Sequence, residues 1–65
     1  MKVTYDRETD TLTITLRDSP IEESDEVRPG VIADFDDAGK VVRFEILRAS
    51  QTVESTNEMQ FAVAT

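Results

Sequence analysis

The chain has 65 residues, 14 acidic and 7 basic side chains, a formal net charge of −7, and neither Cys nor His. A domain of this size buries only about 60% of the surface that its unfolded chain exposes. The absence of Cys excludes disulfides, and the absence of both Cys and His leaves zinc without its preferred ligands. The excess of acidic residues argues against nucleic-acid binding, which depends on neutralising phosphates. No apolar stretch is long enough to span a membrane, and no signal-peptide-like run follows Lys2, so we expect a cytoplasmic protein.

Apolar and polar residues alternate in two runs near the start of the chain, which is the pattern of half-buried β-strands. A four-residue turn at 7–10 would pair Tyr5 with Leu12 and Val3 with Ile14. All apolar side chains of the two strands then lie on one face, and a turn of odd length would break this agreement. The sequence therefore predicts an antiparallel hairpin.

Residues 18–26 are acidic and contain Pro20, so we expect a loop there. A second extended region follows at 27–35, interrupted by Pro29 and Gly30, which mark a turn or a bulge. The acidic side chains form a candidate contact surface for a basic partner: Glu22, Glu23, Asp25 and Glu26. The alternative is that these charges only keep a small domain soluble.

A second hairpin is predicted from 31–35 and 40–47, around a turn rich in Asp and Gly. A two-residue turn at 38–39 would align three apolar pairs and one charged pair: Phe35 with Val42, Ala33 with Phe44, Val31 with Ile46, and Asp34 with Arg43. A longer turn would shift the partners but keep the faces. In each of the two predicted hairpins, the paired apolar side chains therefore lie on one face.

The remainder of the chain is less regular. Residues 48–53 favour a short helix, and Met59–Val63 alternates again, so 54–65 is either an extra strand or a disordered tail. We therefore predict a single small domain at 1–53 followed by this tail. The fold class is mainly β, a β-rich α+β protein: an antiparallel sheet of two hairpins, four to five strands, with a short C-terminal helix.

Several apolar residues fall outside the predicted core. Ile32, Val41 and Leu47 alternate onto the face that carries Asp34 and Arg43, where water is expected. Apolar residues on such a face indicate that it is covered, by the tail, by the acidic loop or by a partner. We take these three residues and Phe61 as the candidate interface, and predict a homo-oligomer (a dimer) or a complex with a protein partner.

One segment resembles a calcium-binding loop. Counted from Asp34, acidic residues fall at positions 1, 3 and 12 and Gly39 at position 6, but Ala38 and Val42 occupy two positions that need oxygen ligands. The flanking residues predict strands, so a hairpin turn explains the same composition. We predict no metal, no cofactor, no catalytic residue and no small-molecule substrate, because no activated nucleophile or Gly-rich phosphate loop accompanies the carboxylates.

An ordered series of short motifs resembles the short prokaryotic proteins of domain-of-unknown-function family 2283. The matching segments are Tyr5-Asp6, Thr9 to Ile14, Ser24 to Val27, Pro29-Gly30-Val31, Asp34-Phe35-Asp36, Gly39 to Val42, Glu45-Ile46-Leu47 and Ala49-Ser50. The resemblance covers roughly 1–53. It implies an acidic protein with β-strands followed by a short helical segment, and no assigned catalytic or cofactor residue.

The sequence thus predicts a non-enzymatic protein-interaction or self-association module. Members of the family that this chain resembles can lie beside small toxin-like genes. That resemblance implies the alternative function, an antitoxin-like acidic neutraliser of a small basic protein.

Overall fold

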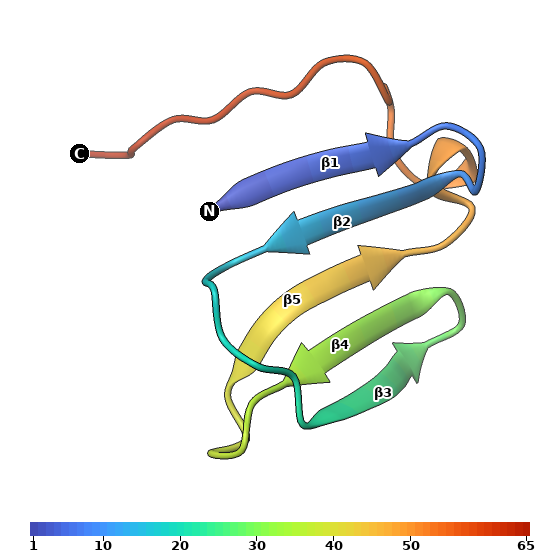
Figure 1. Ribbon diagram of the computed structural model, residues 1–65. Helices are drawn as coiled ribbons and strands as arrows, with labels where there is room; N and C mark the ends of the chain where they lie inside the picture. The colour runs from blue at the N-terminus through green and yellow to red at the C-terminus, as the bar shows by residue number, and fades with distance from the viewer.

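The computed structural model describes residues 1–65, which form one five-stranded antiparallel sheet (Figure 1). The strands are β1 (Lys2–Asp6), β2 (Thr11–Thr15), β3 (Glu23–Arg28), β4 (Val31–Phe35) and β5 (Val41–Ile46). Their spatial order is β1-β2-β5-β4-β3, so the last strand lies in the middle of the sheet. The predicted antiparallel, mainly β fold is confirmed, whereas the predicted short helix is only a 3-10 turn, η1 (Ala49–Gln51).

The first hairpin has the predicted register. Tyr5 lies opposite Leu12 and Val3 opposite Ile14, with the polar pair Thr4 and Thr13 on the other face. The turn ends at Asp10, whose φ of 52° is left-handed. Asp tolerates this conformation better than most residues, because its short polar side chain can bond locally.

The predicted loop at 18–26 is partly wrong, because Glu23 to Glu26 belong to β3. This strand pairs with β4 at the edge of the sheet, and every one of its residues is exposed. An edge strand with both faces in water needs no apolar residue at alternate positions, so it leaves no period-2 signal. Charges on such a strand also discourage pairing with other chains.

The β4–β5 hairpin differs from its predicted form at one end. Ala33 pairs with Phe44 and Asp34 with Arg43, as predicted, but Phe35 pairs with Val41 rather than Val42. The shift is a β-bulge, which places one extra residue on β5. The turn before it is longer than two residues, with Gly39 at a φ of 79°.

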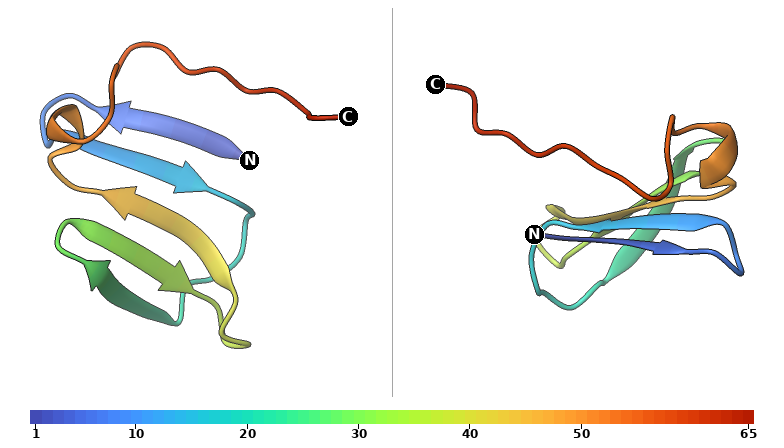
Figure 2. Two further views of the ribbon diagram at one scale, coloured as in Figure 1. Left: turned by 180° about the vertical axis from the view of Figure 1, so that it is seen from behind. Right: turned by 90° about the horizontal axis from the view of Figure 1, so that it is seen from above.

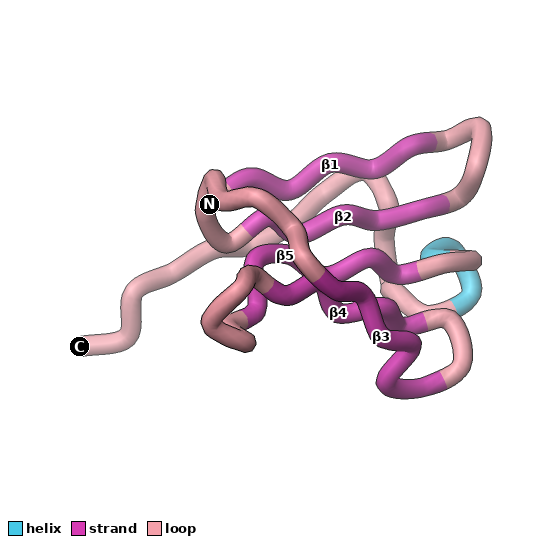
Figure 3. The backbone as a smooth tube through the Cα atoms, turned by 60° about the horizontal axis from the view of Figure 1, so that its bottom comes forward, coloured by secondary structure: helices cyan, strands magenta, loops and turns pink.

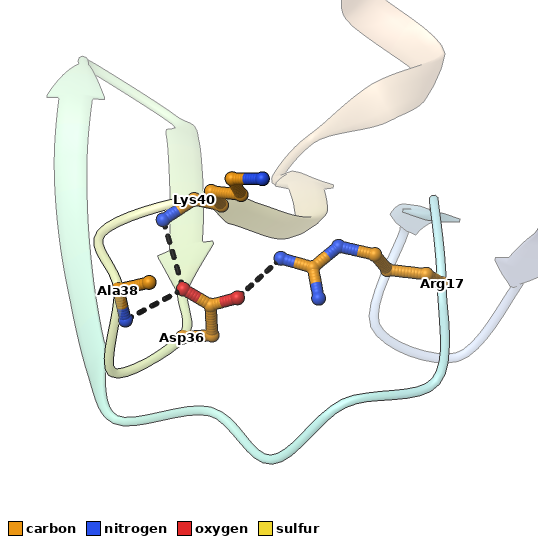
Figure 4. Close-up of polar contacts among 4 residues, drawn as sticks. All are labelled: Arg17, Asp36, Ala38 and Lys40. Carbon is orange, nitrogen blue, oxygen red and sulfur yellow. Dashed lines mark hydrogen bonds and ion pairs between the residues drawn. The ribbon is translucent and has the colours of Figure 1, made fainter.

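One carboxylate holds this turn to the connection that leaves β2 (Figure 4). Asp36 accepts hydrogen bonds at Oδ1 from the backbone N–H groups of Ala38 and Lys40, both at 2.9 Å, and at Oδ2 from Arg17 at 2.5 Å. Bonding to the Arg17 guanidinium, together with the two backbone bonds, holds the pKa of Asp36 below its ordinary value. This ion pair fixes the start of the β2–β3 crossover, residues 16–22, against the β4–β5 turn.

The crossover at 16–22 and the C-terminal segment lie on opposite sides of the sheet. Seen from above in Figure 2, the C-terminal segment lies on one side and the crossover on the other, and Figure 3 shows the crossover passing in front of the strands. Residues after η1 contain no strand. The molecule is a single sheet layer, with extents of 33 × 33 × 19 Å.

Candidate functional site

One face of the sheet is apolar over four strands. Cross-strand partners share a face, so the pairing places these side chains together: Val3 and Tyr5 of β1, Leu12 and Ile14 of β2, Val42, Phe44 and Ile46 of β5, and Val31, Ala33 and Phe35 of β4. We call this surface the apolar face. It is the inner face that alternation predicts for both hairpins, now joined into one continuous surface because β2 pairs with β5.

The apolar face has an incomplete cover. The fully buried apolar residues of the whole chain are Ala33, Val42 and Ala49, and no Leu, Ile or Phe side chain is buried. A domain ordinarily packs two layers so that such a face leaves water. Here the second layer is missing over most of the sheet.

The existing cover lies over β1 and β2. Val53 and residues 55–59 face the apolar side chains of these two strands across a groove of about 500 Å³. The groove is lined on the sheet side by Val3, Tyr5, Leu12 and Ile14. No residue of β4 or β5 lines it, so the part of the face around Phe44 and Val31 lies outside the groove.

A carboxylate holds the start of this cover in place. Asp10 accepts hydrogen bonds from the hydroxyl groups of Tyr5 and Ser50, each at 2.6 Å, and from the Ser50 backbone N–H at 3.0 Å. These bonds, that of the Ser50 hydroxyl most of all, hold the pKa of Asp10 below its ordinary value. The same contact raises the pKa of the Tyr5 phenol. Sequence reasoning missed Asp10, because its partner Ser50 is 40 positions away.

The opposite face is polar and centres on a buried carboxylate. Asp34 is 1% exposed and accepts hydrogen bonds from the Ser24 hydroxyl at 2.5 Å and from Arg43 Nε at 2.7 Å. Burial raises the pKa of Asp34, but these bonds outweigh it and the net shift is downward. Hydrogen bonding to Asp34, followed by burial, raises the pKa of Glu45. No buried side-chain nitrogen or oxygen lacks a hydrogen-bond partner.

The predicted interface residues lie in different places. Ile32 pairs with Glu45 on the polar face and is half-buried, and Leu47 is half-buried just after β5. Val41 does not keep the face expected for it, because the bulge places it opposite Phe35 and so beside the apolar face. Phe61 is 67% exposed and far along the C-terminal segment. The structure does not bring these four residues together.

The predicted acidic surface is also divided. Glu22, Glu23, Asp25 and Glu26 are all exposed. Pairing places Glu23 opposite Phe35 and Asp25 opposite Ala33, so these two carboxylates border the apolar face. Glu26 lies opposite Ile32 on the polar side, and accepts a bond from the Gly30 N–H at 3.3 Å.

Neither a cluster of metal-ligating side chains nor a membrane-spanning helix is present in the structure. No group of three or more His, Cys, Asp or Glu side chains is placed to hold a metal ion. The residues of the calcium-loop-like segment form the β4–β5 hairpin, where Asp34 and Asp36 bond to Arg43 and Arg17. No helix has the length and hydrophobicity needed to cross a membrane.

These features define a small single-sheet β protein with one partly covered apolar face and a charged edge strand. Residues 2–50 match the family described as "Protein of unknown function (DUF2283)", and the chain belongs to this family. The match includes all five strands and most of η1, and stops before the C-terminal segment that covers β1 and β2. No curated protein and no solved structure matches the chain.

Proposed function

We propose that this protein is a self-association module, in which the apolar face packs against the same face of a second copy. The observation that supports this most directly is the missing second layer: the face carries ten apolar side chains, and only Ala33 and Val42 among them are buried. Burying apolar area favours association by about 25 cal/mol per Å² before the entropy lost on binding is subtracted. A second identical sheet supplies a matching surface and completes a two-layer sandwich.

A two-fold arrangement places the same patch of both copies in contact, as in most homodimers. Val53 and residues 55–59 of each copy already lie over β1 and β2, so the two sheets would face each other with these segments between them.

The charge distribution permits the contact but opposes it at long range. The net charge of −7 makes two copies repel each other, while Glu23 and Asp25 stand only at the border of the apolar face. At 0.1 M ionic strength, salt largely screens the repulsion between exposed charges that are more than about 10 Å apart. We therefore expect the dimer to become tighter as salt rises, which is the reverse of an association driven by ion pairs.

Sedimentation equilibrium with paired variants tests this proposal. Phe44→Lys places a charge in the middle of the apolar face and should abolish the dimer, whereas Thr13→Lys, on the opposite face of neighbouring β2, should leave it intact. Circular dichroism of both variants checks that the sheet still forms. A wild-type chain that sediments as a monomer at every concentration would exclude self-association.

The alternative function, neutralisation of a basic protein, is supported by β3. This strand is exposed along its whole length and carries Glu23, Asp25 and Glu26. A basic protein retained by the tagged chain from its native host, and lost when these three residues are changed to Gln, would favour this function. Retention that is unchanged in the Gln variant would argue against it.

A further inference from the structure

The last seven residues of the C-terminal segment, 59–65, carry three exposed apolar side chains, of which Met59 also lines the groove over β1 and β2. Met59, Phe61 and Val63 are 63%, 67% and 77% exposed. They stand at alternate positions, so an extended segment presents all three on one side. The segment has no charged residue and is the longest uncharged stretch of a chain in which 32% of the residues are charged.

The path of this segment leads it away from the β4–β5 half of its own sheet. The groove over β1 and β2 is lined by the chain only as far as Met59. Beyond that point the segment runs past the free edge of β1, on the side away from β5 and β4, and rises from the apolar side of the sheet (Figures 1 and 2). Phe44 of β5 and Val31 of β4 therefore remain beyond its reach without a reversal of direction.

We propose that residues 59–65 of one copy dock on the β4–β5 half of the apolar face of a second copy, around Phe44 and Val31. This inference rests on the self-association proposed above and names the segment that is exchanged. Each chain carries a β4–β5 half-face whose larger apolar side chains, Phe44 and Val31 among them, are only half-buried, together with an exposed apolar segment. A two-fold dimer would cover both in a reciprocal way. Because no side chain in 59–65 is charged, docking buries no unpaired side-chain charge.

The length of the segment is sufficient for this role. Seven extended residues span about 23 Å at 3.3 Å per residue, and neighbouring strands are about 4.8 Å apart. The segment is therefore long enough to cross both β5 and β4 of a facing sheet, with its three apolar side chains in contact with these strands. In each copy, Val53 and residues 55–58 stay over β1 and β2, in the groove that they already line.

Substitutions on the apolar side of residues 59–65, compared with substitutions on the other side, test this docking. In the triple variant Met59→Ser, Phe61→Ser, Val63→Ser, we expect the dimer dissociation constant to rise about 100-fold or more, because three large apolar side chains leave the interface. The control Gln60→Ser, Ala62→Ser changes the other side of the same segment and should alter it less than about threefold. Circular dichroism confirms that each variant keeps its sheet.

Disulfide trapping decides which chain receives the segment, and the absence of native Cys makes it specific. A chain with Phe61→Cys and a chain with Phe44→Cys, mixed and oxidised at neutral pH, should yield a mixed disulfide dimer. A chain that carries both substitutions should form linked dimers rather than a disulfide-closed monomer. A closed monomer as the main product would overturn docking on a second copy.

The outcomes separate the two proposals. A wild-type dimer whose dissociation constant is unchanged in the triple Ser variant would overturn the exchange of 59–65 and leave self-association through the apolar face standing. A wild-type chain that is monomeric throughout would overturn both. A dimer weakened by the triple variant and not by the control would support the exchange.

Discussion

Asp10 joins three parts of the chain through one residue. Its carboxylate binds Tyr5 of β1 and Ser50 of η1, and its backbone carbonyl accepts the N–H of Ala49 at 2.9 Å. We expect Asp10→Ala to lower the melting temperature by several degrees, because a small domain shifts by about 4–8 °C per kcal/mol. The exposed Asp18→Ala serves as the control, since Asp18 forms no such bonds. Equal melting temperatures for the two variants would contradict the role given to Asp10.

The lowered pKa values of Asp10 and Asp36 predict an acid-sensitive fold. Ser50 lowers the first and Arg17 the second. A carboxyl whose folded pKa is below its unfolded value of about 3.9 contributes stability above that pH, and this stability is lost as the pH falls through the folded value. Urea unfolding at pH 7 and near pH 3 should show a smaller loss in Asp10→Asn than in wild type. An identical loss would contradict the assignment.

The pKa of Glu45 is shifted in the opposite direction, upward. Its pKa is raised by Asp34, so the stability gained from its protonated form is present below an unfolded pKa of about 4.3 and is lost as the pH rises through the folded pKa. At pH 7 Glu45→Gln removes the repulsion from Asp34 at the cost of a weak 3.9 Å pair with Arg43. We expect a gain on the order of 0.5 kcal/mol by urea unfolding. The exposed Glu54→Gln should change nothing, and a clear loss in Glu45→Gln would refute the prediction.

At the scale of the elements, two turns depend on glycine for different reasons. Gly30 and Gly39 both have a φ of +79°, which costs a residue with a side chain roughly 1–2 kcal/mol. A Cβ on Gly30 would also lie 3.2 Å from the Arg48 guanidinium, whereas nothing lies within 4 Å of one on Gly39. Gly30→Ala should therefore destabilise the protein more than Gly39→Ala in urea unfolding. Equal losses would show that Arg48 moves freely.

The elements differ in how well the sequence predicts them. The β1–β2 register followed from alternation and one turn length, because a shift by one residue would turn an entire apolar set toward water. β3 could not be found in this way, since its side chains are exposed on both faces. The bulge at Val42 was missed because Asp36 closes the β4–β5 turn with its side chain, together with Arg17 from a distant segment. No local sequence pattern marks a turn that is fixed by a side chain from a distant segment.

At the scale of the whole molecule, the candidate site is the apolar face, whose residues the alternating pattern predicts as core. The inner-face residues were predicted, but only the strand order shows that they form one layer with little packed on it. The predicted interface of Ile32, Val41, Leu47 and Phe61 came from apolar residues outside that pattern, and the structure separates them. Phe61 alone enters the proposed contact. The acidic residues of β3 are exposed, and their division between two faces depends on pairing with β4.

The central claim is that a second copy completes the core of this protein. Its most direct test is the melting temperature of the wild-type chain over a roughly thousandfold range of concentration, because a partner that binds only the folded state stabilises it by mass action. We expect the melting temperature to rise steadily with concentration, and to rise further at each concentration when salt is added. A melting temperature that is independent of concentration, for a chain that stays monomeric throughout, would contradict the claim.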